Sequence, residues 1–296
     1  MRGRPQTAQR FKKQIIDYVD RLSVRVFHIS QLRRLLDELI FEKLLPRSMR
    51  KKQFIAFLEK ETFLKEVLID SKISGKKSLS RYLWREASPL EIALSLKPNS
   101  YLTHASALFY QSLTDSVPKY IFVNYEQLPK SPRDEPLSQD EIDLAFSSPQ
   151  RESKNIYNYD GLQIVLLNGK NTKHLEVGTI TINNLLIPVT KIERTLIDAV
   201  VRPIYSGGVY QVLKAFETAR THSNISISVL LATLKKLEFV YPYHQAIGFF
   251  LQRAGYNKEQ YDRFKALGIN YKFYLSYDIR EPEYNKEWQL VIPKGF

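Results

Sequence analysis

The stretch from Pro46 to Trp84 constrains the fold most, because a basic helix start is followed there by a hairpin pattern. Ser48 is suited to cap a helix over residues 48–60, whose apolar residues lie in its second half. Two β-type runs follow at 63–69 and 79–84, separated by a lysine-rich turn. A helix with a basic first turn before a hairpin with a basic tip is the outline of a winged helix.

Two further helices are expected upstream of this stretch. Apolar spacing predicts one over 9–22, and Ser30 is a suitable cap for another over 31–45, which Pro46 prevents from continuing. Residues 24–29 fit either a short strand or a connector. Three helices followed by a two-stranded wing favour DNA binding. The alternative is an amphipathic helix whose basic face is only solvated.

The positive charge is concentrated in the first third of the chain. Residues 1–97 hold 22 Lys and Arg against 11 Asp and Glu, a net charge of +11. Residues 98–296 hold 22 against 20, a net charge of +2. A basic field on a small domain suits a polyanion partner, because neutralising phosphates releases condensed counterions. We therefore expect double-stranded DNA as the partner of residues 1–97, with a basic surface kept only for solubility as the alternative.

Candidate DNA contacts follow from this outline. The N-terminal part of the third helix would enter the major groove, with Arg50, Lys51 and Gln53 at base edges. Phosphate contacts are expected from other basic side chains of the helix entry and the wing. An Arg-Gly-Arg-Pro sequence near the N-terminus matches the core of an AT-hook, which lies in the minor groove. The candidate DNA-binding residues are Arg2, Arg4, Arg47, Ser48, Arg50, Lys51, Lys52, Gln53, Lys72, Lys76, Lys77 and Arg81.

The remainder of the chain reads as a second domain. Lys97-Pro98-Asn99-Ser100 marks a boundary, after which helical and β-type runs are interleaved. The pair Asn183-Asn184, between two β-type runs, predicts a hairpin turn. The whole chain is therefore expected to be α+β, with a winged-helix domain at 1–97 and an α/β domain at 98–296. Helices are expected at 89–96, 101–113, 138–146, 191–201, 209–221, 223–237, 243–254 and 258–267, and strands at 120–125, 162–167, 175–182, 185–189, 271–279 and 288–292.

Several classes of chemistry lack their residues. The chain has no cysteine, which excludes disulfides and thiolate metal sites, and it contains no nucleotide-binding or zinc-binding motif. No apolar run is long enough to span a bilayer, and the N-terminus lacks a secretory signal, so a cytoplasmic protein is expected. A metal-dependent nuclease is the enzymatic alternative, resting on Asp70-Ser71-Lys72 or Glu152-Ser153-Lys154. A second alternative is a regulator that binds RNA through the basic face.

Three segments of the second half resemble the AbiEi family of bacterial antitoxins, which act in type IV toxin–antitoxin and abortive-infection systems. The first is Tyr101-Leu-Thr-His-Ala-Ser-Ala-Leu108, and it follows directly after the basic domain. The second is Pro188-Val-Thr-Lys-Ile-Glu-Arg-Thr-Leu-Ile-Asp198, and the third is Gly207-Gly208-Val209. Their order and spacing cover roughly residues 20–220. Residues from about 223 onward have no counterpart in the resemblance and read as an extension of unknown role.

The resemblance implies a function. It implies a winged-helix repressor of its own operon, acting on inverted repeats in the promoter, and an antitoxin domain behind it. The implied partner is a nucleotidyltransferase-like toxin, which is counteracted without a stable complex being required. We expect no enzymatic activity, no cofactor and no metal, because the corresponding motifs are missing. The motif residues, read as structural, are His104, Ser106, Arg194, Thr195, Asp198, Gly207 and Gly208. Arg194 and Asp198 are one helical turn apart, as an i,i+4 ion pair requires.

Overall fold

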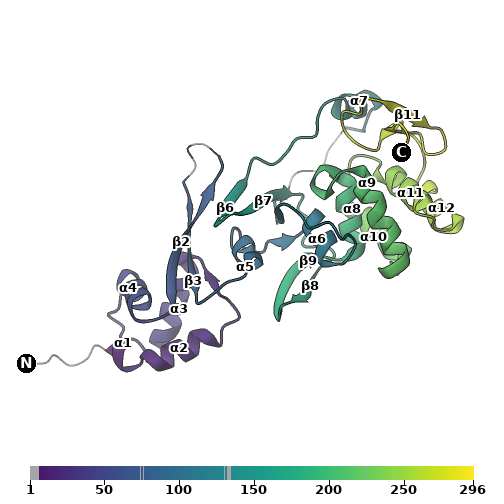
Figure 1. Cartoon of the computed structure of the whole chain (residues 1–296). Coiled ribbons are helices and arrows are strands. Elements are labelled where there is room, and N and C mark those ends of the chain that lie inside the picture. The colour runs from purple at the N-terminus through teal and green to yellow at the C-terminus, as the bar shows by residue number, and fades with distance from the viewer. Residues whose placement is uncertain (1–6, 74, 76, 130, 132–134, 224) are drawn as a thin grey trace, which may run out of the picture. The chain divides into compact units, whose positions relative to one another are not determined.

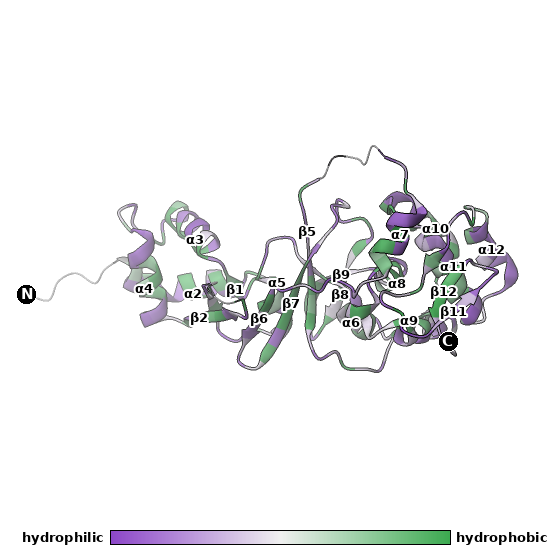
Figure 2. Ribbon diagram, turned by 90° about the horizontal axis from the view of Figure 1, so that it is seen from above, coloured by the Kyte–Doolittle hydropathy of each residue, from purple (hydrophilic) through white to green (hydrophobic). Residues whose placement is uncertain are grey.

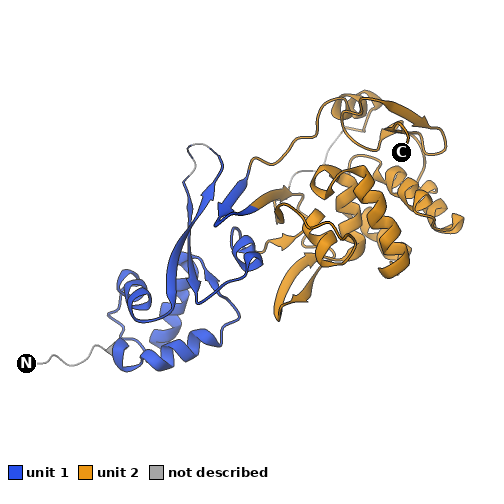
Figure 3. Ribbon diagram, in the orientation of Figure 1, with its two compact units in different colours: residues 1–98, 155–163 blue, residues 99–154, 164–296 orange. Residues whose placement is uncertain are grey.

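The computed structural model describes residues 7–73, 75, 77–129, 131, 135–223 and 225–296. They form two compact units (Figures 1 and 3), and the expected α+β class is confirmed. Unit 1 comprises 1–98 and 155–163, and unit 2 comprises 99–154 and 164–296. All of 98–296 was expected to form one domain. Residues 155–163 depart from that division because they return to pair with a strand of unit 1.

Helices of unit 1 enclose a small core. They are α1 (Thr7–Arg10), α2 (Lys12–Asp20), α3 (Ile29–Phe41) and α4 (Lys51–Glu61), and a further helix, α5 (Pro89–Leu94), follows the hairpin. The 3.6-residue spacing of the apolar residues places their side chains on the inner faces of α2, α3 and α4. The fully buried residues of this core include Ile15, Leu32, Leu39, Phe54, Leu58 and Trp84. The indole Nε1–H of Trp84 donates to Asp20 Oδ1 at 2.7 Å, which ties the last strand of the hairpin to α2.

The strands of unit 1 are antiparallel in the order β1-β3-β2-β6. They are β1 (Val26–Phe27), β2 (Leu64–Ser71), β3 (Leu79–Trp84) and β6 (Ile156–Tyr159). The hairpin of β2 and β3 matches the two expected β-type runs. β6 was not expected, and it pairs with the end of β2 that leads into the hairpin turn. The backbone N–H of Lys72 also donates to the carbonyl of Ile156 at 2.8 Å.

The sheet of unit 2 mixes parallel and antiparallel pairs in the order β7-β5-β4-β9-β8. Its strands are β4 (Tyr101–Leu102), β5 (Ile121–Glu126), β7 (Leu162–Gly169), β8 (Val177–Ile182) and β9 (Leu185–Thr190). β8 and β9 form the hairpin expected from Asn183-Asn184. Both asparagines have positive φ, as a two-residue type I′ turn requires.

The helices of unit 2 pack around α8 (Ile192–Val201), which contacts α6 (His104–Tyr110), α9 (Val209–Thr218), α10 (Ile227–Leu237) and α11 (Tyr243–Arg253). The expected helix over 101–113 is wrong at its start, because Tyr101 and Leu102 form β4 and the helix begins at His104. The remaining helical elements are α7 (Gln139–Phe146), a short 3₁₀ turn η1 (Pro203–Ser206), a π turn η2 (Ala219–Ser223) and α12 (Lys258–Lys265).

Residues 223–296 are an integral part of unit 2. Phe250 and Trp288 belong to the same hydrophobic cluster as Leu108 and Leu196, which lie far earlier in the chain. A small sheet in the order β10-β12-β11 closes this region, with β10 (Phe273–Tyr274), β11 (Pro282–Asn285) and β12 (Leu290–Pro293). Figure 2 shows α12 as mostly hydrophilic, consistent with a helix that buries only Phe264 fully. No helix in the described ranges is long and apolar enough to cross a membrane.

Candidate nucleic-acid interface and the buried polar network

The basic residues at the start of α4 are exposed to solvent. Arg47, Arg50, Lys51 and Lys52 lie within six positions, and none forms an ion pair within the described part of the chain. Two cap details differ from expectation. Ser48 lies in a turn closed by the Met49 N–H and the Pro46 carbonyl, so it is not the cap. Arg50 is the N-cap instead.

Gln53 contributes to this helix start. Its Oε1 accepts a hydrogen bond from the Arg50 backbone N–H at 3.0 Å, half of the reciprocal capping arrangement. Its amide oxygen is therefore occupied. The expectation that Gln53 reads a base edge stays a prediction, because an amide oxygen has a second lone pair and the amide nitrogen is a separate donor.

Arg81 is buried, which overturns its assignment as a phosphate contact. Only 5% of the residue is exposed. Its Nε and Nη2 donate to the Ser95 carbonyl at 2.9 and 2.8 Å, and Nη1 donates to the Ser80 carbonyl at 2.7 Å. Burial lowers the pKa of this guanidinium. The side chain holds the segment after α5 against the hairpin and has no free face for DNA.

The turn of the β2–β3 hairpin carries the remaining candidates. Lys72 and Lys77 are exposed, although the Lys72 Nζ donates to Gln163 Oε1 at 2.9 Å. Below the turn, Asp70 and Glu66 on β2 accept hydrogen bonds from Ser78 and Ser80 on the opposite side of the hairpin. The exposed cations Lys72 and Lys77 therefore lie beyond a stretch of the hairpin that carries two carboxylates. Three predicted contacts, Arg2, Arg4 and Lys76, lie outside the described residues.

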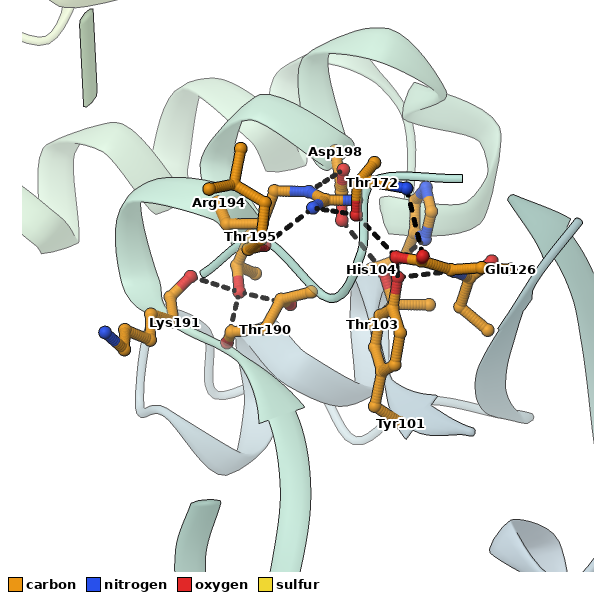
Figure 4. A network of polar contacts seen from close by, with 12 residues as sticks. Tyr101, Thr103, His104, Glu126, Thr172, Thr190, Lys191, Arg194, Thr195 and Asp198 are labelled. Carbon is orange, nitrogen blue, oxygen red and sulfur yellow. Dashed lines mark hydrogen bonds and ion pairs between the residues drawn. The ribbon is translucent and has the colours of Figure 1, made fainter. Parts of the chain in front are cut away.

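In unit 2 the motif residues meet in a buried polar network (Figure 4). Arg194 Nε donates to Asp198 Oδ1 at 2.8 Å, so the expected i,i+4 ion pair is present. Their side chains are only 6% and 10% exposed. Burial tends to lower the pKa of Arg194, but the neighbouring Asp198 outweighs it and the pKa is raised. A buried ion pair of this kind is stable only when each side chain has further partners.

One partner of Asp198 is Thr103, the residue between β4 and α6. Thr103 Oγ1 donates to Asp198 Oδ2 at 3.2 Å and lies 3.0 Å from His104 Nδ1. Because the one hydroxyl hydrogen of Thr103 goes to the carboxylate, His104 must donate from Nδ1. His104 Nε2 then carries a lone pair and is buried with no partner among the described residues. Burial lowers the pKa of this imidazole to about 4.

A second carboxylate, Glu126 at the end of β5, organises the turn before β8. It accepts hydrogen bonds from the Tyr101 hydroxyl, the Thr172 hydroxyl and backbone N–H, and the His174 N–H. Burial tends to raise the pKa of Glu126, but these bonds prevail and hold it below the ordinary value. Arg194 Nη1 donates to the Leu175 carbonyl at 2.8 Å, so the same network reaches this turn twice. Sequence reasoning missed Glu126, since a lone Glu at a strand end carries no signal.

The other motif residues also serve the architecture. Thr195 Oγ1 lies within 3.0 Å of the Thr190 and Lys191 carbonyls and accepts from the Gln111 amide, and Ser106 Oγ accepts from the Phe122 N–H. Gly207 and Gly208 have φ of +87° and +88°, which only glycine adopts without strain, and they turn the chain from η1 into α9. The network residues Tyr101, Thr103, His104, Thr190, Arg194, Thr195 and Asp198 are all less than 10% exposed.

No group of three or more His, Cys, Asp or Glu side chains suited to hold a metal occurs in the described ranges. Residues of both acid-x-Lys sequences form hydrogen bonds elsewhere in the structure. Asp70 accepts from Ser78, and Ser153, between Glu152 and Lys154, donates its N–H to the Tyr205 hydroxyl at 2.6 Å.

Comparisons with known proteins give a fold likeness alone. No family model matches the chain, and no curated protein matches it. Among solved structures, it is similar to the crystal structure of the Rv2827c protein from Mycobacterium tuberculosis. The TM-score is 0.52 at 15% sequence identity, over 96% of this chain and 91% of that chain. The likeness therefore spans both units of the chain, and at this identity it concerns the fold and not the activity.

Proposed function

We propose that unit 1 is a winged-helix domain that binds double-stranded DNA. The order of its elements supports the proposal: α2, β1, α3, α4 and the β2–β3 hairpin follow one another, and β1 pairs with β3. In this arrangement α4 is the recognition helix and the hairpin turn is the wing tip. The N-terminal residues of α4 would face base edges, as in other helix-turn-helix proteins.

The observation that carries the proposal is the group of four exposed cations at the start of α4. Arg47, Arg50, Lys51 and Lys52 have no ion-pair partner within the described residues, so their charge is available to phosphates. They belong to the part of the chain that holds nearly all of its excess positive charge. Lys77 adds a cation at the wing tip. Arg50 and Lys51 are the candidates for base edges, with Arg47, Lys52 and Lys77 on phosphates.

Gel shifts with the DNA upstream of the protein's own gene test this proposal. We expect replacement of Arg47, Arg50, Lys51 and Lys52 by alanine to abolish the shift at moderate salt. Of the four cations, Arg47 and Lys52 are assigned to phosphates, so the slope of log affinity against log salt should fall by about 1.8, which is about 0.9 per contact.

The matched control removes the same charge from unit 2. Lys214, Lys235, Lys236 and Arg253 are exposed, and their replacement by alanine lowers the net charge of the chain equally. We expect this variant to bind DNA almost as tightly as the unaltered protein. Equal losses in the two variants would show that only net charge matters and would refute the proposed interface. Preferential displacement of the DNA by structured RNA at matched salt would assign the same surface to RNA.

We further propose that the protein is the antitoxin of a type IV toxin–antitoxin system and represses its own operon. The support is the resemblance of the three motif segments to the AbiEi family, together with a polar network in unit 2 that joins the first two of them. A promoter–reporter fusion tests repression, and co-expression with the neighbouring gene tests the antitoxin activity. A neighbouring nucleotidyltransferase-like gene is expected to arrest growth when expressed alone. If co-expression of this protein does not relieve that arrest, the antitoxin assignment is refuted and DNA binding is left intact.

A further inference from the structure

The free edge of β8 is unusual for the edge of a sheet. β8 lies at the end of the strand order and pairs only with β9 in the part of the chain that the structure describes. Edge strands of natural proteins are commonly protected from pairing by charges, prolines or bulges. From Val177 to Ile182 there is no charged residue and no proline, and the register with β9 is continuous. Thr179 and Thr181 are exposed.

The backbone groups that face this open edge can be identified. Thr179 is opposite Pro188, which has no N–H, so that pair cannot exchange two hydrogen bonds. Hydrogen-bonded and non-hydrogen-bonded pairs alternate along an antiparallel ladder. The N–H and C=O groups of Thr179 and Thr181 therefore point away from β9, whereas those of Ile180 point toward it. The N–H of Val177, the next outward position, already donates to the His174 carbonyl at 3.0 Å.

We propose that β8 is a self-association edge, at which two copies of this chain pair their β8 strands antiparallel about a two-fold axis through Ile180. In this register Thr179 of each copy is opposite Thr181 of the other copy. The N–H and C=O groups of Thr179 and Thr181 in each copy are then paired with those of the other copy, giving four hydrogen bonds.

The side chains agree with the same register. Ile180 is opposite Ile187 within the hairpin, and Ile182 is opposite Leu185. Pairing about Ile180 places the two Ile180 side chains side by side, so a continuous apolar row crosses the four strands from Ile187 of one copy to Ile187 of the other. Such cross-strand pairs of β-branched residues stabilise a sheet.

Charge also selects a second copy as the occupant. The whole chain carries +13, but the stretch 177–190 is uncharged, so two copies meet here without facing like charges. A strongly charged peptide would find no counter-charge along the edge. One short strand per copy buries less than the ~800 Å² per partner of a standard interface, so we expect association in the micromolar range.

Sedimentation equilibrium of the full chain without DNA tests the proposal. The average mass should rise with concentration from 34.6 kDa toward twice that value. Thr179→Pro removes one outward donor from each copy and leaves the β8–β9 bonds in place, because the Thr179 N–H does not face β9. We expect it to weaken association at least tenfold. The matched control Thr179→Val keeps the N–H group and should associate like the unaltered protein.

The register has its own test, because the chain contains no cysteine. Two Ile180 residues at a non-hydrogen-bonded pair would have Cα atoms about 4.5 Å apart, within the range of a disulfide. Ile180→Cys should therefore form a covalent dimer on mild oxidation. In Thr181→Cys the two cysteines would be about 8 Å apart and should not cross-link.

A chain that stays at its monomer mass throughout the micromolar range would overturn the proposal. So would association that Thr179→Pro leaves unchanged, or a disulfide that forms through Thr181→Cys and not through Ile180→Cys. The proposal goes beyond DNA binding and does not depend on it. A monomeric protein that still shifts its promoter would refute self-association and leave DNA binding intact. A dimer that does not shift the promoter would do the opposite.

Discussion

Acidification is expected to weaken unit 2 through His104. The imidazole is buried and neutral in the folded chain, and burial lowers its pKa from 6.5 to about 4. In the unfolded chain it takes up a proton near its ordinary pKa. Between these two values the unfolded state binds more protons than the folded state. The free energy of unfolding therefore falls as the pH falls through this window, and the loss is complete below about pH 4.

The magnitude follows from the two pKa values. Between about pH 7 and about pH 5, the linkage relation gives a loss of about 2 kcal/mol from this one group. The structure explains why the proton is resisted: Nδ1 already donates to Thr103, and a second proton would go on Nε2, which is buried without an acceptor. Asp198 is close enough to favour the charged form, but the loss of hydration is the larger effect.

Urea denaturation at a series of pH values, followed by fluorescence, measures this effect against a His104→Asn variant. Asparagine tolerates the left-handed backbone that His104 adopts, with φ of +49°, and does not titrate. The difference in pH dependence between the two proteins isolates His104, because carboxylates titrate alike in both. Parallel stability profiles, or an imidazole resonance that titrates near the ordinary pKa in the folded protein, would refute the reasoning.

Three further predictions concern stability. Arg194→Ala should lower the free energy of unfolding by about 3–5 kcal/mol in urea denaturation, because it leaves Asp198 charged and buried without its partner. Arg81→Ala should lower the free energy of unfolding by about 1–3 kcal/mol, seen in calorimetry as a lower melting temperature, because it removes four hydrogen bonds to backbone carbonyls. Gly248→Ala should be destabilising in the same assay by about 1–3 kcal/mol or more, since the added Cβ would lie 2.2 Å from the Trp288 ring.

Sequence reasoning was most accurate where structure is set locally. The hairpin at Asn183-Asn184 followed from two residues that tolerate positive φ, between two β-type runs. The strand expected at 79–84 has those bounds in the structure, and the helix expected at 138–146 starts beside Ser138, whose side chain accepts from the Glu141 N–H. Each of these features depends on interactions within a few residues of sequence, so a single chain contains the whole signal.

Features that depend on distant partners were missed. β6 is four residues long and exists because β2, about ninety residues earlier, offers it an edge, so no local pattern marks it. Arg81 was assigned to the surface because it is charged. Its burial depends on the carbonyls of Ser95 and Leu96, which come within reach only after α5 folds back on the hairpin. Charge alone does not predict exposure when backbone carbonyls can satisfy a guanidinium.

The candidate site was predicted only where its contacts are local in sequence. The ion pair of Arg194 and Asp198 followed from helical spacing, because i,i+4 residues share a face. Its connection to Thr103 did not, since that contact joins residues ninety-five positions apart. The exposed cations before α4 are where the charge pattern placed them, but the cap moved from Ser48 to Arg50 because the preceding residues close a turn.

The buried network is connected to β8 through the turn that precedes this strand. Lys173, His174 and Glu176 all adopt positive φ immediately before β8, a conformation that disfavours non-glycine residues by roughly 1–2 kcal/mol each. Such strain persists only where the surroundings over-determine it. Here Glu126 binds the turn from one side, Arg194 binds its Leu175 carbonyl, and Lys191 pairs with Glu176 at 3.0 Å. The motif residues therefore fix the point from which β8 starts, so disrupting the ion pair should weaken self-association as well as stability.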